Sequence, residues 1–166
     1  MKQKLALSCA LIHMPKILLL DEPTFGVDPI SRRDLWLIVH EMVHEGVTVV
    51  VSTAYMDEAE RFDRVALLHQ GKLLALDTPA ALQRALHGEL LHIEVEPVRA
   101  AQALLVRHPR VRRVALFGDR LHVTVESAAS DRPVIEAVLR DGGLTPHTLA
   151  AAPATMEDVF IERMTD

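Results

Sequence analysis

Apolar residues along the chain fall into short unbroken runs and into longer stretches where they recur every three or four positions. The first unbroken run, residues 17–20, ends at the acidic pair Asp21 and Glu22, and residues 47–53, with valine at 49, 50 and 51, are interpreted as a second buried strand. Such runs, without polar alternation, are typical of strands buried on both faces in a parallel sheet. Because Pro23 cannot donate to a sheet ladder and favours an extended conformation at Glu22, the first strand is predicted to end at the two acids.

A helix is predicted between the two runs, from residue 29 to about residue 45. Asp28 is a favourable N-cap residue, Pro29 suits the first helical position, and Gly46 ends the helix. Strand, helix and strand of these lengths predict a right-handed crossover between two parallel strands, whose carboxyl ends are where such sheets place ligands. The apolar stripe of the helix is predicted to consist of Leu35, Ile38, Val39 and Met42.

The remaining pattern predicts short helices and two hairpins. A helix is also expected over residues 1–13, and the hairpins have their turns at residues 70–72 and 118–120. From residue 89 the order strand, helix, strand, strand, helix, strand is that of a ferredoxin-like unit, and Thr155 and Asp158 form a capping box that opens a last helix. The other predicted helices cover residues 56–61, 80–86, 100–106 and 133–140.

Composition narrows the class of protein. The chain has 166 residues, of which 49% are hydrophobic and 25% charged, so it can bury a core and is neither disordered nor fibrous. A net charge of −5 without a basic stripe argues against nucleic acid as a partner. The single cysteine, Cys9, excludes an internal disulfide framework and fits a reducing cytoplasm. No apolar run approaches the ~18–20 residues of a membrane helix, so any membrane role is expected to act through a partner chain.

The acid pair is the strongest chemical signal in the sequence. Adjacent carboxylates repel each other unless a cation or hydrogen-bond donors compensate their charge. In phosphoryl-transfer enzymes, a strand-end aspartate holds Mg²⁺, usually through water, and a second carboxylate orients the attacking water. Two ordinary solvated acids at a strand end explain the same residues, so the pair alone leaves both interpretations open.

Four segments resemble motifs of the ATP-binding subunits of ABC transporters, in particular drug-export-like bacterial ones. Residues 17–22 resemble the Walker B strand with its catalytic glutamate, and residues 23–29 resemble the D-loop in its P-T-x-G-x-D-P form. Residues 1–5 are similar to the segment after the signature loop, and residues 49–60 are similar to the switch strand with its acidic helix. The resemblance extends to about residue 86.

This resemblance implies an α/β fold with an incomplete P-loop-type ABC ATPase core. We expect residues 1–88 to form the carboxyl-terminal part of an ATP-binding domain with parallel strands. Residues 89–166 are expected to form a small α+β, ferredoxin-like accessory domain. For the full-length parent protein, the implied cofactors are ATP and Mg²⁺, and the implied partners are a second ATP-binding subunit and a membrane permease. The implied location is cytoplasmic, at the inner face of the cell membrane.

The resemblance also implies roles for individual residues. Glu22 is expected to be the catalytic carboxylate, Asp21 the Mg²⁺ ligand through water, and Asp28 a cofactor-binding residue of the D-loop. Ala54 occupies the position where the family usually carries a histidine that contacts the γ-phosphate. Because a methyl group cannot hydrogen-bond a phosphate, one polar contact is expected to be missing, with hydrolysis by the parent protein reduced rather than abolished.

Two alternatives to an ATPase component follow from what the sequence lacks and from one further motif. No G-x-x-x-x-G-K-[ST] phosphate loop occurs in it, and by the resemblance the Q-loop and most of the signature loop would also lie before residue 1. The chain by itself is therefore expected to be inactive and to bind Mg·ATP no more tightly than the millimolar range, about −4 kcal/mol. A non-catalytic assembly or regulatory module is therefore the first alternative. The second is a zinc hydrolase, because His40, Glu41 and His44 form an H-E-x-x-H pattern, although no third ligand follows at the short spacing.

Overall fold

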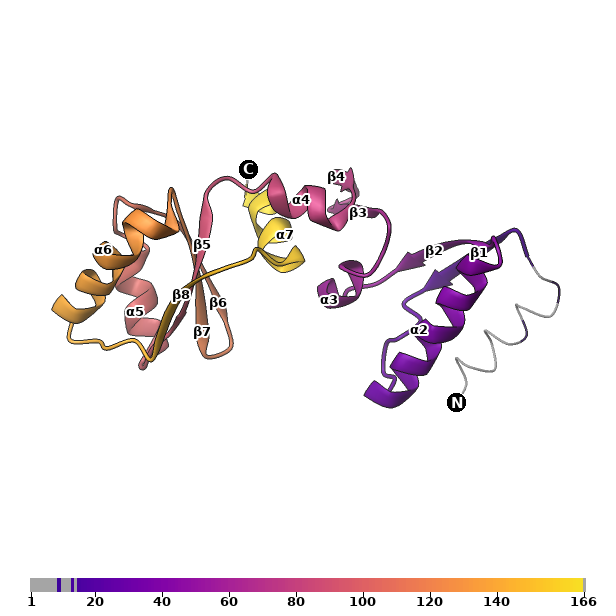
Figure 1. Cartoon of the computed structure of the whole chain (residues 1–166), viewed down its shortest axis with the longest axis horizontal. Coiled ribbons are helices and arrows are strands. Elements are labelled where there is room, and N and C mark those ends of the chain that lie inside the picture. Colours follow the sequence, from indigo (N-terminus) through magenta and orange to yellow (C-terminus); the bar gives the residue numbers. More distant parts are fainter. Residues whose placement is uncertain (1–8, 10–12, 14, 166) are drawn as a thin grey trace. The chain divides into compact units, whose positions relative to one another are not determined.

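The structure is a computed structural model that describes Cys9, His13 and residues 15–165 (Figure 1). Apart from Cys9 and His13, the helix predicted over residues 1–13 lies outside the described residues. The chain divides into two compact units, Met1–Glu58 and Ala59–Asp166, and the described residues of these units form one parallel and two antiparallel sheets. The architecture is thus mixed α/β, and the predicted domain boundary at residue 88 stays a prediction.

The first unit is built on a parallel strand pair joined by a helix. β1 (Ile17–Asp21) pairs with β2 (Thr48–Ser52), and the register places Asp21 opposite Ser52 at the carboxyl ends. α2 (Pro29–His44) connects the strands as predicted, with the Asp28 carboxylate accepting a hydrogen bond from the backbone N–H of Ser31 at 2.9 Å. α3 (Met56–Ala59) ends earlier than predicted, because the backbone N–H of Phe62 bonds to the carbonyl of Ala59 in a tighter turn.

The prediction that both faces of the first strand are buried is wrong for this chain. Successive strand residues point to opposite faces, and here Leu18 is 5% exposed whereas Leu19 is 73% exposed. On β2, Val50 is likewise exposed, and Val49 and Val51 are half-buried. An apolar run records that a strand tolerates burial on both faces, but whether a second layer covers it depends on the other elements present.

The buried stripe of α2 differs from the predicted one at its edges. Leu35 and Val39 are buried as predicted, whereas Ile38 and Met42 are only half-buried. Trp36 is buried in their place, and its indole N–H donates to the carboxylate of Glu58 at 3.1 Å. The helical period of apolar residues predicts roughly which side of α2 is buried. The hydrogen bond from Trp36 to Glu58 explains why Trp36 is part of that buried side.

The second unit begins with a hairpin and continues into a four-stranded antiparallel sheet. The hairpin pairs β3 (Val65–His69) with β4 (Lys72–Asp77), and Thr78 caps the helix α4 (Pro79–Arg84) that follows. The strand order of the larger sheet is β6-β7-β5-β8, with every neighbouring pair antiparallel. The remaining elements are β5 (Glu89–Glu94), α5 (Val98–Leu105), β6 (Val111–Phe117), β7 (Arg120–Val125), α6 (Ala128–Asp141), β8 (Thr148–Ala152) and α7 (Met156–Thr165).

The core of this unit lies between the four-stranded sheet and the two helices α5 and α6 (Figure 1). Alternate residues of β5 and β7 point into it, and these residues are fully buried. α6 begins at Ala128 rather than at Pro133 as predicted. Its start is fixed by Asp131, whose buried carboxylate accepts hydrogen bonds from the backbone of Ser127 and the guanidinium of Arg110. The fully buried core side chains include Leu91, Ile93, Leu105, Leu121, Val123, Ile135 and Leu139.

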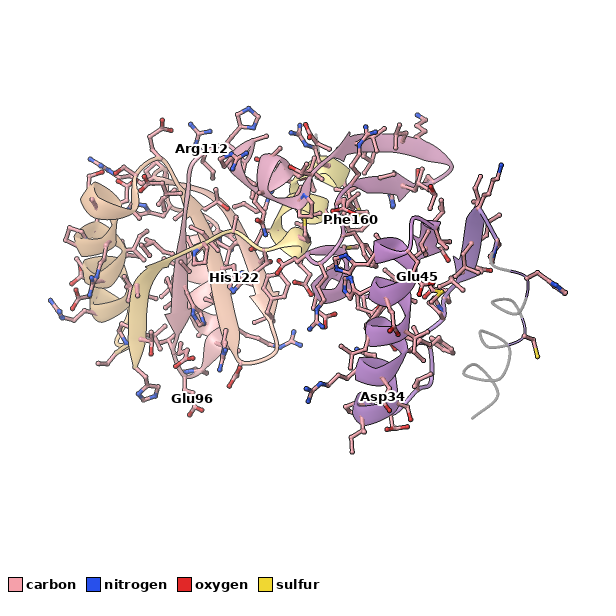
Figure 2. The ribbon with its side chains drawn as sticks, turned by 45° about the vertical axis from the view of Figure 1, so that its right-hand side comes forward. Asp34, Glu45, Glu96, Arg112, His122 and Phe160 are labelled. Atoms are coloured by element: carbon pink, nitrogen blue, oxygen red, sulfur yellow. The ribbon has the colours of Figure 1, made fainter. Side chains whose placement is uncertain are left out.

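α7 packs against α4 and β4, and it contacts the four-stranded sheet through His122 on β7, which is labelled in Figure 2. The Nδ1 atom of His122 lies 2.9 Å from the carboxylate of Asp158, and its ring lies 4.5 Å from that of Phe117 between centroids. The predicted capping box is confirmed, because the carboxylate of Asp158 accepts from the backbone N–H of Thr155 and the Thr155 hydroxyl accepts from the Asp158 N–H. In the described part of the chain, every helix is too short or too polar to cross a membrane.

Candidate functional site

The two acids singled out from the sequence lie where the parallel strands end. Asp21 is the last residue of β1, and Glu22 follows it directly. The hydroxyl of Ser52, at the end of β2, donates to Oδ1 of Asp21, and the same hydroxyl accepts from the backbone N–H of Glu22 at 3.0 Å. One serine therefore joins the two strand ends and orients the Asp21 carboxylate, which is exposed to solvent.

The backbone of Glu22 is not extended as predicted but has a φ of +44°. Its N–H donates to the carbonyl of Ser52 at 3.1 Å, and its own carbonyl accepts from the N–H of Phe25 at 3.1 Å, so the chain turns sharply here. A left-handed conformation is uncommon for a residue with a side chain and persists only where the surroundings hold it. The following proline disfavours the right-handed helical region, and the hydrogen bonds to the neighbouring strand select the left-handed one.

Ala54 meets Glu22 through its backbone. The N–H of Ala54 donates to Oε2 of Glu22 at 3.2 Å, and the Glu22 side chain is half-buried. Alanine in place of the usual histidine was predicted to remove a side-chain contact to the γ-phosphate, and that prediction concerns only the Ala54 methyl group. The backbone at this position is still used, and it directs the carboxylate of Glu22.

Asp28 acts locally in the structure. Its hydrogen bond from the Ser31 backbone caps α2 and lowers the pKa of the Asp28 carboxyl below its usual value. The structure thus brings Asp21, Glu22 and Ala54 together, while the Asp28 carboxylate bonds to the first turn of α2. The chemical roles of these four residues remain predictions.

Two residues of this region were missed by the sequence analysis. Ser52 could have been found, because parallel pairing of the two predicted strands places their last residues side by side. Glu58 carried no signal, since an acid on a short acidic helix is usually solvated. Its side chain is nevertheless only 2% exposed and accepts hydrogen bonds from three other side chains.

The donor set fits a hydrated Mg²⁺. This ion is usually bound by one or two carboxylates, with waters and substrate phosphates completing its octahedral shell. Asp21 is exposed and has one carboxylate oxygen engaged by Ser52, so the other is available to a water of such a shell. Groups of three or more histidine, cysteine, aspartate or glutamate side chains that could hold a metal are absent from the described residues. On α2, His40 and His44 of the H-E-x-x-H pattern are exposed, and the structure gives the zinc alternative no third ligand among those residues.

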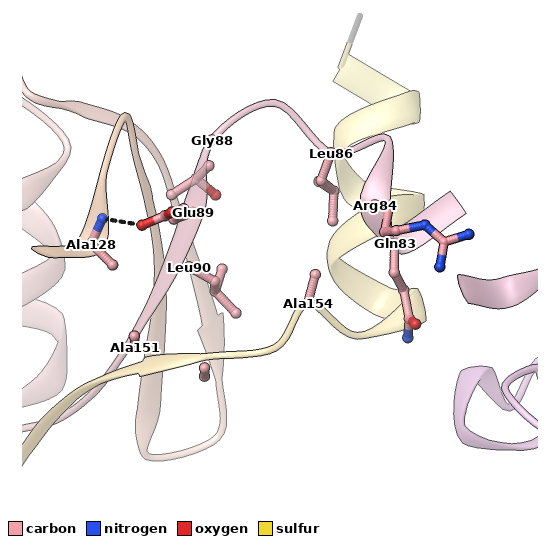
Figure 3. Close-up of a pocket in the computed structure, with 11 residues that line it drawn as sticks. Gln83, Arg84, Leu86, Gly88, Glu89, Leu90, Ala128, Ala151 and Ala154 are labelled. Carbon is pink, nitrogen blue, oxygen red and sulfur yellow. Dashed lines mark hydrogen bonds between the residues drawn. The ribbon is translucent and has the colours of Figure 1, made fainter. Parts of the chain in front are cut away.

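A separate hollow of about 390 Å³ lies in the second unit, between the end of α4 and the start of β5 (Figure 3). Its walls include Leu86, Leu90 and several alanines, and the acid that lines it, Glu89, accepts a hydrogen bond from the backbone N–H of Ala128 at 2.6 Å. Since this carboxylate already serves the start of α6, the hollow has less catalytic potential than the strand-end acids.

Comparison with known proteins finds homologues among the ATP-binding proteins of ABC transporters. The chain is 57% identical over 82 residues to the probable multidrug ABC transporter ATP-binding protein YbhF of Escherichia coli, a match that covers 49% of this chain and 14% of YbhF. It is 35% identical over 162 residues to the Nod factor export ATP-binding protein I of Neorhizobium galegae, covering 97% of this chain and 45% of that protein. With the daunorubicin resistance ATP-binding protein DrrA2 of Streptomyces coeruleorubidus, the identity is 30% over 170 residues, with 97% and 52% covered.

These matches cover nearly all of this chain but only part of each relative. The chain spans about half of the two longer-matching relatives and a smaller share of YbhF. No family model matches it. The motif resemblance is confirmed by the curated relatives: the chain is homologous, over 97% of its length, to ATP-binding proteins of drug-export-type ABC transporters.

Proposed function

We propose that this chain supplies the Mg²⁺-holding and water-orienting acids of an ATP-hydrolysing component of an export-type ABC transporter. Its homology to ATP-binding proteins supports ATP as the nucleotide in this proposal. The observation that carries the proposal is the acid pair at the ends of the parallel strands, where Ser52 orients Asp21 and the Ala54 backbone orients Glu22. This is the edge of a parallel sheet at which ligands bind.

The two acids would have different tasks. Asp21 would hold Mg²⁺ through water, and the ion, when bound, would neutralise charge on the phosphates of ATP. Glu22 has Oε2 engaged by the N–H of Ala54, so its Oε1 is free to accept a hydrogen bond from the attacking water. A carboxylate in that position acts as a general base. Because the methyl group of Ala54 donates no hydrogen bond, we expect slower hydrolysis than a histidine there would allow.

The proposal extends to partners and to the second unit. A second ATP-binding subunit and a membrane permease are the proposed partners, which would place the protein at the cytoplasmic face of a membrane, and Asp28 is proposed to serve the nucleotide site through the D-loop. We further propose that residues 89–166 form a ferredoxin-like accessory domain. The strand order β6-β7-β5-β8 and the chain order of strands and helices support this assignment.

A hybrid protein tests the assignment of Glu22. In it, residues 1–166 replace the aligned part of the Nod factor export ATP-binding protein I of Neorhizobium galegae, which they match over 45% of its length. We expect the hybrid to hydrolyse Mg·ATP and the Glu22→Gln variant to lose at least about 100-fold in kcat while still binding ATP, since a general base contributes 10²–10⁴-fold. Glu41→Gln, at an exposed acid of α2, is the matched control and should leave kcat unchanged.

The same experiment separates the proposal from its alternative. Hydrolysis by the hybrid that is unchanged in Glu22→Gln would contradict the role given to Glu22. A hybrid that binds ATP and dimerises but shows no hydrolysis, also after Ala54→His, would favour a non-catalytic assembly module. Restored or faster hydrolysis in Ala54→His would instead support the proposed loss of a phosphate contact at that position.

A further inference from the structure

The most unusual polar group of the first unit is the buried carboxylate of Glu58 on α3. Its side chain is 2% exposed. Three side chains donate hydrogen bonds to it: the Thr24 hydroxyl at 3.0 Å, the Thr53 hydroxyl at 2.7 Å and the indole N–H of Trp36 at 3.1 Å. Burying a charged group is unfavourable unless it is hydrogen-bonded, and this carboxylate is bonded on both oxygens.

The donors come from three segments that are distant in the sequence. Thr24 lies in the turn after the acid pair, Trp36 lies on α2, and Thr53 directly follows β2. Glu58 thus accepts hydrogen bonds from all three of these segments. A buried polar network of this kind, when satisfied, fixes one arrangement of the groups it joins.

Two further contacts involve the segment of residues 53–55. The Thr53 hydroxyl accepts from the backbone N–H of Tyr55 at 3.1 Å. The guanidinium of Arg32 lies 4.3 Å above the ring of Tyr55, and its Nε lies 3.6 Å from Oε1 of Glu58. A cation over an aromatic face is attractive, so Arg32 links α2 to the same loop.

Both segments that determine where Glu22 points are therefore attached to Glu58. Thr24 lies two residues after Glu22, and Thr53 directly precedes Ala54, whose N–H donates to the Glu22 carboxylate. The left-handed backbone of Glu22 also needs surroundings that hold it. We infer that Glu58 is a positioning residue, which sets the direction of the Glu22 carboxylate by tying the turn at Thr24 to the loop at Ala54.

The expected effect of Glu58 on hydrolysis rests on the proposed function. Its effect on the direction of the Glu22 carboxylate does not depend on that function. The geometry is tested on the 166-residue chain by NMR. Trp36 is the single tryptophan, so its indole N–H gives one assignable signal. In Glu58→Gln, we expect this signal and the Ala54 amide signal to shift, and hydrogen exchange of the Ala54 amide to accelerate about tenfold, as expected when a bond of ~1.4 kcal/mol is lost.

The matched control is Asp57→Asn, which removes the neighbouring exposed acid of the same helix and should move neither signal. If the indole signal shifts in Glu58→Gln while the Ala54 amide keeps its wild-type shift and exchange rate, Glu58 does not position Glu22 and the inference is overturned. Should Glu58→Gln fail to fold, Thr53→Val removes one donor with little change of shape, and the same two outcomes apply to its Ala54 amide.

The catalytic consequence is measured in the hybrid protein. Because Glu58 does not touch the nucleotide in this proposal, Glu58→Gln should lower kcat roughly tenfold, a partial loss of the 10²–10⁴-fold that a base contributes, with KM for ATP unchanged. A rise in KM with constant kcat would contradict a positioning role. A hybrid whose hydrolysis is insensitive to Glu22→Gln refutes the proposed function, while the Ala54 amide still decides the inference about Glu58.

Discussion

The attachment of α7 to the four-stranded sheet provides a quantitative prediction for Asp158→Ala. Asp158 lies in the first turn of α7, and its side chain is 6% exposed. Its carboxylate accepts from His122 Nδ1 at 2.9 Å and from the backbone N–H and hydroxyl of Thr155 at 2.9 and 2.7 Å. The substitution removes all three contacts at once, so that His122 on β7 and Thr155 before α7 lose this acceptor.

The expected loss follows from two terms. Removing a helix cap typically costs about 1 kcal/mol, and losing a hydrogen bond to a charged group costs about 1.5–3 kcal/mol. The free energy of unfolding should therefore fall by roughly 3 kcal/mol. For a chain of this size, 1 kcal/mol corresponds to about 2–4 °C in Tm, so Tm should drop by about 6–12 °C.

The loss should also depend on pH. Burial raises the pKa of Asp158, but the hydrogen bonds from His122 and Thr155 outweigh burial, and the pKa lies below its usual value in the folded chain. A lowered folded-state pKa stabilises the fold above the unfolded-state pKa of about 3.9, and this stabilisation is lost as the pH falls through the folded-state value. The difference between wild type and Asp158→Ala should therefore be constant near neutral pH and shrink in acid.

Thermal unfolding followed by far-UV circular dichroism measures both effects, with hydrogen exchange of the β7 and α7 amides localising them to the second unit. Glu157→Ala, at the neighbouring exposed acid of α7, is the control and should shift Tm by no more than about 2 °C, since an ordinary surface substitution changes the free energy of unfolding by up to about 0.5 kcal/mol. A Tm for Asp158→Ala equal to that of the control, or a difference that grows below pH 4, would refute the argument.

Two further predictions concern the backbone and the apolar layers. Gly88→Ala should destabilise the fold by several kcal/mol, because φ is +99° and a Cβ there would lie 2.2 Å from the carbonyl oxygen of Val125. Gly118→Ala, where φ is +60° and the Cβ would point into open space, should cost only about 1–2 kcal/mol. Equal losses of Tm in the two variants would contradict this prediction. Leu18→Ala should lower the free energy of unfolding by about 2–5 kcal/mol and Leu19→Ala by less than about 0.5 kcal/mol, since Leu18 is buried and Leu19 is exposed. Denaturant titration measures both losses, and similar values would show that another part of the protein covers Leu19.

Local rules predicted much of the secondary structure of this chain. Asp28 with Pro29 and Thr155 with Asp158 define helix starts, because a cap is decided by residues within one turn of each other. The two apolar runs predicted the parallel strands, and with them the position of Asp21 at a strand end. The order of the motif segments indicated the family, which the curated relatives confirm.

What the tertiary structure alone decided involves partners far apart in the sequence. Proline at 23 predicted an extended Glu22, but hydrogen bonds to Ser52 on the neighbouring strand select a left-handed backbone instead. Periodicity gave Glu58 no reason to be buried, and that burial is favourable because Thr24 and Trp36, 34 and 22 residues away, donate hydrogen bonds to it together with the nearby Thr53. A sequence pattern indicates which local conformations each residue tolerates and which face of an element can be buried. Hydrogen bonds between distant residues, and the packing of one element over another, determine which of these possibilities is adopted. Both depend on how the elements come together in space.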